Sequence, residues 1–393
     1  MPGVLSQLLG TGRVVALDIG SHSIKMVEAQ DRGETVEIVA LATAPTPPNS
    51  LDNGVIMDLI AVGNAITELM ATAGITGGSA ATVVTDPSLV ATRVQMPRLL
   101  QKTLHRTIRF EARKHVPFDV EESLIECQVL DPESDSEQMT VLLVAVRQNV
   151  VQSRIACLQR VGLEPVFMDV EQFASLRALV YASRNPQVFH ETIALIRIGA
   201  AFTELAMIRN GAFVFPRIVP IAGTHMDRAI AAGLNVDLEE ARRIKEQRAV
   251  ASRRDQLSSL EQDERQVSQL VAPALEEITR DLQRSFIFLA TQLQLDPSSH
   301  IVDRVLLSGG VANMRNIAPY LAAQLNVRVE VPNVFLDTNV SAPAYDAHTL
   351  ASLAPTVSVV VGLALRDVIA SGRYVFAGKP ASDNVAQLMP ADR

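Results

Sequence analysis

Two stretches of the chain share one pattern, and the first, residues 14–27, reads VVALDIGSHSIKMV. The second, residues 193–206, reads IALIRIGAAFTELA. Each is an apolar strand, a turn with a glycine and a second strand, and each second strand ends near another turn glycine, Gly33 or Gly211. The sequence therefore predicts two related halves, each built on a hairpin.

A third landmark is the apolar run VLLSGG at residues 305–310. A helical pattern over residues 313–325 and an apolar strand over residues 327–331 follow it. Strand, glycine turn, helix and strand form a βαβ unit, whose turn lies at the carboxyl edge of a sheet. Small ligands bind at such edges, so we expect a binding site there.

Composition limits the class of protein. The 393 residues are 48% hydrophobic and 20% charged, and no uncharged apolar run approaches the roughly 18–20 residues of a membrane span. The net charge of −8 and the 4% of aromatic residues argue against nucleic acid as a partner. The first residues show no secretion signal, so we expect a cytoplasmic protein.

Standard catalytic signatures are missing. The chain has no G-x-x-x-x-G-K-[ST], no G-x-G-x-x-G after a strand, no H-E-x-x-H and no G-x-S-x-G. The two cysteines, Cys127 and Cys157, form no C-x-x-C pair. The P-loop, Rossmann, zinc-hydrolase and serine-hydrolase classes are therefore disfavoured.

The turn at residues 18–23 has the composition of a phosphate-binding turn. Gly20 permits a sharp turn in which backbone N–H groups converge, and two serine hydroxyls stand nearby. Asp18, at the strand end, is a candidate to bind Mg²⁺ through water, and Lys25 a candidate to face phosphates. An ordinary glycine turn is the alternative.

The pairing of the two turns favours nucleotide binding, because they can approach a phosphate chain from opposite sides while Gly309 and Gly310 let a nucleoside lie against backbone. The second turn departs from this scheme, since Arg197 stands where the first has a carboxylate. This arginine either contacts phosphate directly or pairs with Glu191 or Glu204.

The segment 98–115 is basic and amphipathic, with apolar residues at four-residue spacing. It serves either a partner peptide or an acidic membrane surface, or it is an ordinary packed helix with a solvated face.

With these residues in view, the chain resembles the PilM family of type IV pilus assembly proteins, which are relatives of FtsA within the actin/Hsp70/sugar-kinase fold. The resemblance extends from about residue 13 to residue 369. Its most specific stretches are ALDIGSHSIKMVE (16–28), RFEARKHVPFDVEESLIECQVL (109–130), VLLVAVRQNVVQSRIACLQRVGLEPVFMDVEQFA (141–174) and LLSGGVANMRNIAPYLAAQLNVRVEV (306–331).

The resemblance implies an α/β, two-lobed actin/Hsp70-like (FtsA-like) fold with a duplicated sheet-and-helix core, a 1C insert and a helical 2B insert. It places the subdomains at 1–87, 162–190 and 346–376 (1A), 88–161 (1C), 191–223 and 301–345 (2A) and 224–300 (2B), with a tail at 377–393.

The resemblance also implies site residues for ATP and Mg²⁺ between the lobes. Those for the nucleotide are Asp18, Gly20, Ser21, Ser23, Lys25, Arg197, Gly199, Ala200, Lys245, Ser308, Gly309 and Gly310. Asp18 would hold Mg²⁺ through water. The family pattern D-I-G reads R-I-G at Arg197, and Arg242 stands where relatives often carry Glu, so we expect at most slow ATP hydrolysis.

The resemblance further implies that the 1A/1C region holds a short N-terminal peptide of a PilN-like inner-membrane protein. We expect this groove near Phe110, Val116, Pro117 and Phe118. Membrane attachment would come through that partner, and contacts with the pilus assembly ATPase machinery and with a second copy of the chain are compatible with this role. The alternatives are a nucleotide-free structural adaptor with a degenerate cleft, an FtsA-like filament protein, or an active ATPase or small-molecule kinase of the same superfold.

Overall fold

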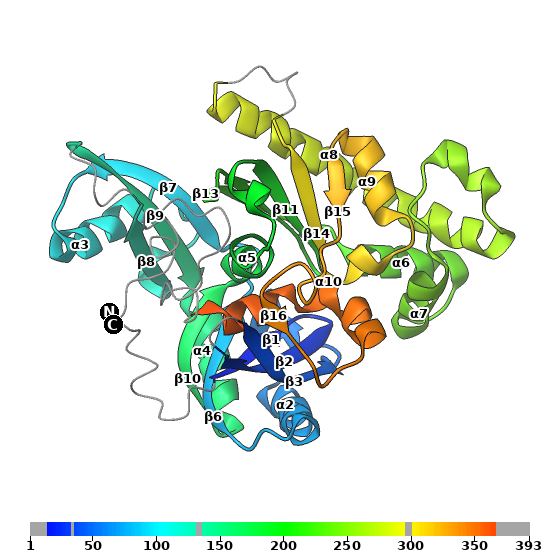
Figure 1. Ribbon diagram of the computed structural model, residues 1–393, viewed down its shortest axis with the longest axis horizontal. Coiled ribbons are helices and arrows are strands. Elements are labelled where there is room, and N and C mark those ends of the chain that lie inside the picture. Colours follow the sequence, from blue (N-terminus) through cyan, green and yellow to red (C-terminus); the bar gives the residue numbers. More distant parts are fainter. Residues whose placement is uncertain (1–13, 33–34, 131–135, 295–300, 367–393) are drawn as a thin grey trace.

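Two large mixed β-sheets and a smaller antiparallel one form the protein (Figure 1). The computed structural model describes residues 14–32, 35–130, 136–294 and 301–366. The first sheet has the strand order β10-β6-β1-β2-β3-β16. Its strands are β1 (Val14–Ile19), β2 (Ser23–Asp31), β3 (Val36–Pro45), β6 (Gly78–Val84), β10 (Leu163–Val170) and β16 (Val340–Ser341).

The second sheet repeats the centre of the first. Its order is β13-β12-β11-β14-β15, with β11 (Thr192–Ile198), β12 (Thr203–Arg209), β13 (Ala212–Val219), β14 (Arg304–Ser308) and β15 (Arg328–Glu330). Both β1 and β11 pair with an antiparallel hairpin partner on one side and with a parallel strand on the other. The two related halves that the sequence predicts are therefore confirmed.

Helices α5 (Glu171–Leu176) and α10 (Ala347–Ala364) lie between the two sheets. Residues of both sheets and both helices share one apolar core, so the central strands are buried on both faces and read as apolar runs. The two helices approach closely at Gly362, where a Cβ atom would lie 1.7 Å from the carbonyl oxygen of Ala174. Only glycine fits at that crossing.

Helix α10 corrects one expectation. It begins at Ala347, and Pro355 lies inside it. By length and composition it is the one helix of the described part that could cross a membrane, whereas the sequence was expected to hold no such stretch. Half of its apolar window is buried inside the protein, as is typical of a core helix.

The remaining helices of the first half cover the other face of its sheet. They are α2 (Leu59–Ala73) and α4 (Gln148–Arg160), which pack against each other beside the short hairpin of β4 (Leu51–Asp52) and β5 (Val55–Ile56). Asp58 accepts hydrogen bonds from the first N–H groups of α2, and Gly74 ends that helix in the left-handed conformation.

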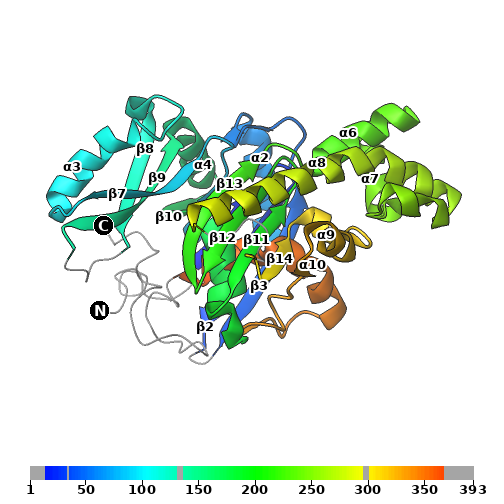
Figure 2. The same cartoon turned by 90° about the horizontal axis from the view of Figure 1, so that it is seen from above.

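The small sheet, β7-β9-β8, carries the basic helix. It consists of β7 (Val90–Pro97), β8 (Ser123–Val129) and β9 (Gln138–Arg147), with α3 (Gln101–Ala112) packed on one face. Leu104, Ile108 and Ala112 of α3 are buried at four-residue spacing. The amphipathic segment 98–115 thus contains a packed helix, and both views place this sheet at one end of the molecule (Figures 1 and 2).

The opposite end is helical (Figure 2). It contains α6 (Gly223–Leu234), α7 (Leu238–Arg248) and α8 (Gln262–Gln292), while α9 (Ile317–Leu325) connects β14 to β15. Helix α7 ends at Arg248, because the chain becomes extended at Ala249. The buried apolar positions of α8 begin at Val267, in the second turn of the helix.

Two details bear on the expected subdomains. Strand β16, from a segment assigned to 2A, pairs with β3 of the first sheet. Helix α4, from the segment assigned to 1C, packs against β10 and α2 of the first half. The tail at 377–393 lies outside the described residues. The subdomain limits themselves stay a prediction.

Candidate functional site

A cleft lies where the turns after β1, β11 and β14 meet the start of α6 and the middle of α7. All the residues predicted to contact the nucleotide line it, except Asp18 and Ser308. Asp18 is buried beneath the first turn, and the Ser308 hydroxyl points to the carbonyl oxygen of Ile196. The topology thus brings together turns that are more than 100 residues apart in the sequence.

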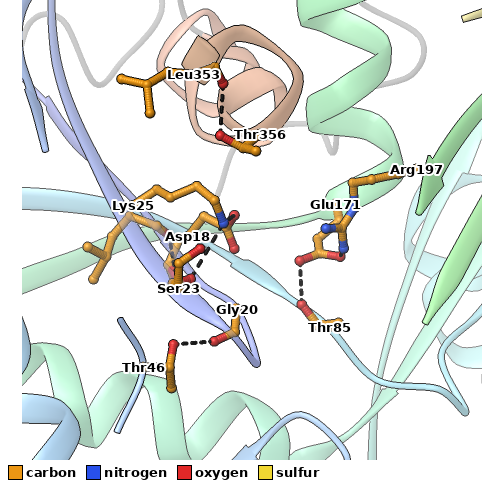
Figure 3. A network of polar contacts seen from close by, with 12 residues as sticks. Asp18, Gly20, Ser23, Lys25, Thr46, Thr85, Glu171, Arg197, Leu353 and Thr356 are labelled. Carbon is orange, nitrogen blue, oxygen red and sulfur yellow. Dashed lines mark hydrogen bonds and ion pairs between the residues drawn. The ribbon is translucent and has the colours of Figure 1, made fainter. Parts of the chain in front are cut away.

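The first turn is held by backbone and side-chain contacts (Figure 3). The Gly20 N–H donates to the Ser23 carbonyl oxygen at 3.2 Å, and the Thr46 hydroxyl donates to the Gly20 carbonyl oxygen at 2.7 Å. The Lys25 ammonium donates to Asp18 Oδ2 at 3.1 Å, while Asp18 Oδ1 has no hydrogen-bond partner. The turn therefore presents Lys25 to the cleft with its charge already matched.

The second turn has the same backbone and an opposite charge arrangement. Arg197 Nε donates to Glu204 at 2.5 Å, and its Nη2 donates to Glu171. The sequence offered two acids as ion-pair partners of Arg197. The pair with Glu204 is confirmed, and the pair with Glu191 is wrong, because Glu191 pairs with Arg304 at 2.7 Å. Glu171 could not be predicted, since helix α5 brings it to Arg197 from the first half of the protein.

The buried charges around Arg197, where helix α5 meets the second turn, influence one another. The Thr85 hydroxyl donates to Glu171 at 2.6 Å. Burial is the strongest influence on Glu171 and raises the pKa of its carboxyl above the usual range; Arg197 opposes this rise, whereas Glu204 and Asp18 add to it. Burial lowers the pKa of Arg197, but the three carboxylates outweigh it and raise that pKa, so the guanidinium stays charged.

The third turn lies directly against the second half's hairpin. Gly309 has a φ of 92°, and a Cβ atom there would lie 2.4 Å from the Ile198 carbonyl oxygen, so this position requires glycine. The Gly309 N–H donates to the Pro355 carbonyl oxygen of α10 at 2.7 Å. A Cβ atom at Gly310 would meet open space, so a ligand can approach the backbone there.

Helices α6 and α7 complete the cleft. Asp227 of α6 forms ion pairs with Lys245 at 2.6 Å and with Arg242 at 3.6 Å. The first N–H groups of α6, at Gly223 and Thr224, donate to carbonyl oxygens of the second turn. Asp227 was not predicted, because nothing in its local sequence marks it. Thr356 of α10 also lines the cleft and was missed for the same reason.

The cleft lining carries more cations than carboxylates among the described residues. The cations are Lys25, Arg197, Arg242 and Lys245, and the carboxylates are Asp227 and Glu246. Burial first, and then the positive charges of Arg242, Lys245 and Lys25, lower the pKa of His22 to about 4 against a smaller opposite effect of Asp227. His22 is therefore neutral at pH 7 in a positive field that suits an anion.

The charges fit Mg²⁺ poorly. Asp18 Oδ1 is a free buried acceptor, but its other oxygen is bound to Lys25, and Glu171 and Glu204 are both bound to Arg197. The described residues contain no group of three His, Cys, Asp or Glu side chains placed to hold a metal ion. Asp18, Glu171 and Glu204 therefore do not form a metal site.

The residues expected to line the peptide groove lie in the last turn of α3 and just after it. Phe110 is 66% exposed, and the Arg113 guanidinium lies 5.5 Å from its ring centroid. Pro117 is exposed, whereas Val116 and Phe118 are half-buried. These side chains form an exposed apolar edge beside cations of the basic helix.

Comparison with known proteins identifies the family. The family model for type IV pilus assembly protein PilM matches residues 16–368. A PilM from a PilM–PilN type IV pilus biogenesis complex is 27% identical with a TM-score of 0.76, and the match covers 90% of this chain and 98% of that chain. The ethanolamine utilization protein EutJ from Carboxydothermus hydrogenoformans is 17% identical with a TM-score of 0.53, over 89% of this chain and 88% of that chain, which shows the fold alone.

Curated relatives agree with this fold. The cell division protein FtsA of Neisseria meningitidis serogroup B is 23% identical over 344 residues, which are 78% of this chain and 80% of that protein. FtsA of Bacillus subtilis is 21% identical over 259 residues, which are 59% of this chain and only 57% of that protein. The two-lobed actin-like fold predicted from the sequence is confirmed, and the chain belongs to the PilM family of type IV pilus assembly proteins.

Proposed function

We propose that this protein is a nucleotide-responsive scaffold of type IV pilus assembly, which binds ATP in the cleft between its halves and a short peptide of a membrane partner beside α3. The observation that carries the proposal is the convergence of three glycine turns on one cleft with an excess of cations. A cleft of this kind suits a polyphosphate chain.

Each turn would have its own role toward the nucleotide. The first turn offers its serine hydroxyls and Lys25 to the phosphates. The open backbone at Gly310 offers a flat surface to the nucleoside, and Lys245 lies between the α6 start and Asp227. Because ATP would touch both halves, its binding fixes the angle between them.

Hydrolysis is expected to be slow. The proposal includes no protein-bound Mg²⁺, since the carboxylates below the first two turns are paired with Lys25 and Arg197. General-base catalysis needs a carboxylate free to accept a proton from water beside the phosphate. Of these acids only Asp18 has an oxygen without a partner, and that oxygen is buried below the turn.

The peptide site would be the apolar edge around Phe110. An exposed phenylalanine and proline next to arginines are suited to a short segment with apolar and acidic side chains. The solved relative forms a complex named for PilN, and by family membership we assign this surface to the cytoplasmic N-terminal peptide of a PilN-like protein. The scaffold would then stand at the cytoplasmic face of the inner membrane through that partner.

Two calorimetric titrations test the proposal, one with ATP and one with the peptide. We expect both ligands to bind the purified full chain. Lys245→Ala should weaken ATP binding at least about tenfold, which is 1.4 kcal/mol, because the Lys245 ammonium faces the cleft. Its matched control is Lys114→Ala, an exposed lysine in the turn after α3 that is paired with Glu111.

For the peptide, Phe110→Ala should abolish measurable binding, whereas Leu336→Ala, a residue exposed to the same extent between β15 and β16, should not. Loss of peptide binding in both variants would contradict the assignment of this surface.

One observation favours a second candidate, a nucleotide-free adaptor. Lys25 and Arg197 are both already bound to carboxylates, so the cleft is charge-balanced at these positions without a ligand. In that case the peptide would bind and ATP would not.

A further inference from the structure

The cation at position 197 lies where the fold duplication would place a second carboxylate. Asp18 of β1 is directly opposite Lys25 of β2, and Arg197 of β11 is directly opposite Glu204 of β12. The two hairpins thus carry the same pair of charges with the signs exchanged. The first half carries a carboxylate at the end of β1, and the second half carries a cation at the end of β11.

The guanidinium is fixed in place from two sides. Glu204 holds it from the neighbouring strand. Glu171 holds it from the first half of the protein (Figure 3). Its third nitrogen, Nη1, points to the second turn: it lies 3.4 Å from where a Cβ atom of Gly199 would be, and Arg197 lines the cleft. Two nitrogens are used for anchoring, and the remaining one faces the ligand space.

We infer that Arg197 supplies to a bound polyphosphate the positive charge that a divalent metal would otherwise supply, so that this protein binds ATP without Mg²⁺. This rests on the nucleotide-binding role proposed above. The observations behind it are the ion pairs that occupy the acids near the cleft and the cation held at the second turn.

The electrostatic reason is local. A metal ion needs free carboxylate or carbonyl oxygens, and a polyphosphate needs cations. Here Arg197, Lys25 and Lys245 provide fixed cations, and a guanidinium is always charged and donates in a planar fork that matches phosphate oxygens. An added Mg²⁺ would have to displace the cation partners that Asp18, Glu171 and Glu204 already have.

The first experiment is a calorimetric titration of the full chain with ATP, once with excess Mg²⁺ and once with EDTA. We expect the two dissociation constants to agree within about threefold, less than 0.7 kcal/mol. If ATP binds with Mg²⁺ but at least about tenfold more weakly in EDTA, this inference is wrong while the nucleotide-binding role stands. If ATP binds in neither buffer, both are wrong.

The second experiment exchanges the charges. Arg197→Asp combined with Glu204→Lys gives the second hairpin the charge order of the first and leaves the net charge unchanged. We expect this double variant to lose at least about tenfold in ATP affinity in EDTA and to recover most of it with Mg²⁺, because the cation at the second turn is gone and Glu171 has lost its ion-pair partner Arg197 and can bind the metal. Equal binding in both buffers would overturn the role given to Arg197.

Two controls accompany it. Exchanging Arg243 and Glu240, an exposed pair of α7 at 2.5 Å, tests charge reversal outside the cleft and should leave Mg²⁺ independence intact. Arg197→Lys keeps the charge and disturbs the fold least, so it should also bind ATP equally in Mg²⁺ and EDTA. A new Mg²⁺ requirement in Arg197→Lys would contradict a role based on charge.

Discussion

The two hairpins of this protein, β1–β2 and β11–β12, have one backbone and two chemistries. In each, the turn glycine donates its N–H to a carbonyl oxygen three residues on: Gly20 to Ser23 at 3.2 Å, and Gly199 to Phe202 at 3.0 Å. In each, the strand before the turn carries a charge that faces an opposite charge on the next strand. The hairpin fold therefore depends on the turn glycine and on the pairing of opposite charges across the strands. It tolerates either a positive or a negative charge on the first strand.

The side chains between the strands differ more than the backbone. The first turn reads Ser21-His22-Ser23, and the second reads Ala200-Ala201-Phe202. The first turn can donate hydroxyls to a ligand, whereas the second offers backbone groups and Arg197. A duplicated backbone thus presents one polar and one apolar turn to the same cleft, and only the side chains decide what each contributes.

The largest difference between the hairpins should appear when each loses its cation. Arg197→Met leaves Glu171 and Glu204 buried without their shared partner, so we expect a loss of about 3–5 kcal/mol in the free energy of unfolding at pH 7. Urea denaturation at neutral pH measures it. Adding Glu171→Gln and Glu204→Gln removes the unpaired charges and should restore most of the stability.

The control is an exposed pair of the same kind. Arg32→Met breaks an ion pair with Glu37 in which the arginine side chain is 47% exposed, so the loss should be far smaller than that of Arg197→Met. An Arg197→Met protein as stable as Arg32→Met would show that the junction of the two halves does not depend on this charge.

The same change in the first hairpin should cost less. Lys25→Met removes the partner of a single buried acid, Asp18, and we expect a loss of about 1–3 kcal/mol. Thermal and urea unfolding of Lys25→Met and Arg197→Met side by side give the ranking. Equal losses would mean that Glu171, the acid contributed across the halves, adds nothing to the second hairpin.

The sequence predicted only part of the similarity and the difference between the two hairpins. The repeated strand-glycine-strand pattern revealed both hairpins, because buried strands are apolar on both faces and a tight turn needs glycine. The exchange of charges was visible at Arg197, and Glu204 was correctly offered as its partner. Glu171 and Asp227 were missed because helices bring them from other segments, and no local pattern encodes such a contact.

Helix limits were the least predictable features. Pro273 and Pro355 both lie inside helices, α8 and α10, so a proline did not mark an end in either case. The site residues at the turns, in contrast, needed no exact helix limits, since a turn that follows a buried strand falls at the sheet edge in any register. The cleft was therefore predictable from three turns, and its ion pairs were not.

A third prediction concerns His22, which has the alanine Ala201 as its counterpart in the second turn. Its pKa is lowered from 6.5 to about 4 by burial and by nearby cations, so the folded state binds fewer protons than the unfolded state in this range. The contribution of the neutral His22 to the free energy of unfolding is therefore fully present above pH 6.5 and is lost as the pH falls towards 4. We expect roughly 1–2 kcal/mol from this residue after solvent screening.

Unfolding in urea at a series of pH values between 7 and 4 measures this contribution. His22→Asn should flatten the decline on the acid side, whereas the exposed His348→Asn should follow the wild-type curve. If the His22→Asn and wild-type curves run parallel, the cations around the cleft do not act on the first turn.

The smallest effect tests the shared backbone itself. A Cβ atom at Gly20 would lie 3.0 Å from the Ser23 carbonyl oxygen, and one at Gly199 would lie 3.2 Å from that of Phe202. Both contacts are tight but can be relieved by small shifts, so Gly20→Ala and Gly199→Ala should each lose about 1 kcal/mol, and by nearly equal amounts. Gly310→Ala, where a Cβ atom meets open space, should change stability least of the three.

Chemical denaturation of the three alanine variants at one pH provides the measurement. Equal losses at Gly20 and Gly199 would mean that the two turns respond as one structure despite their different side chains. If one loss exceeded the other by more than about 1 kcal/mol, the hydrogen-bonded turn would not be the common unit, and the charge pairs beneath each turn would have to set its shape as well as its chemistry.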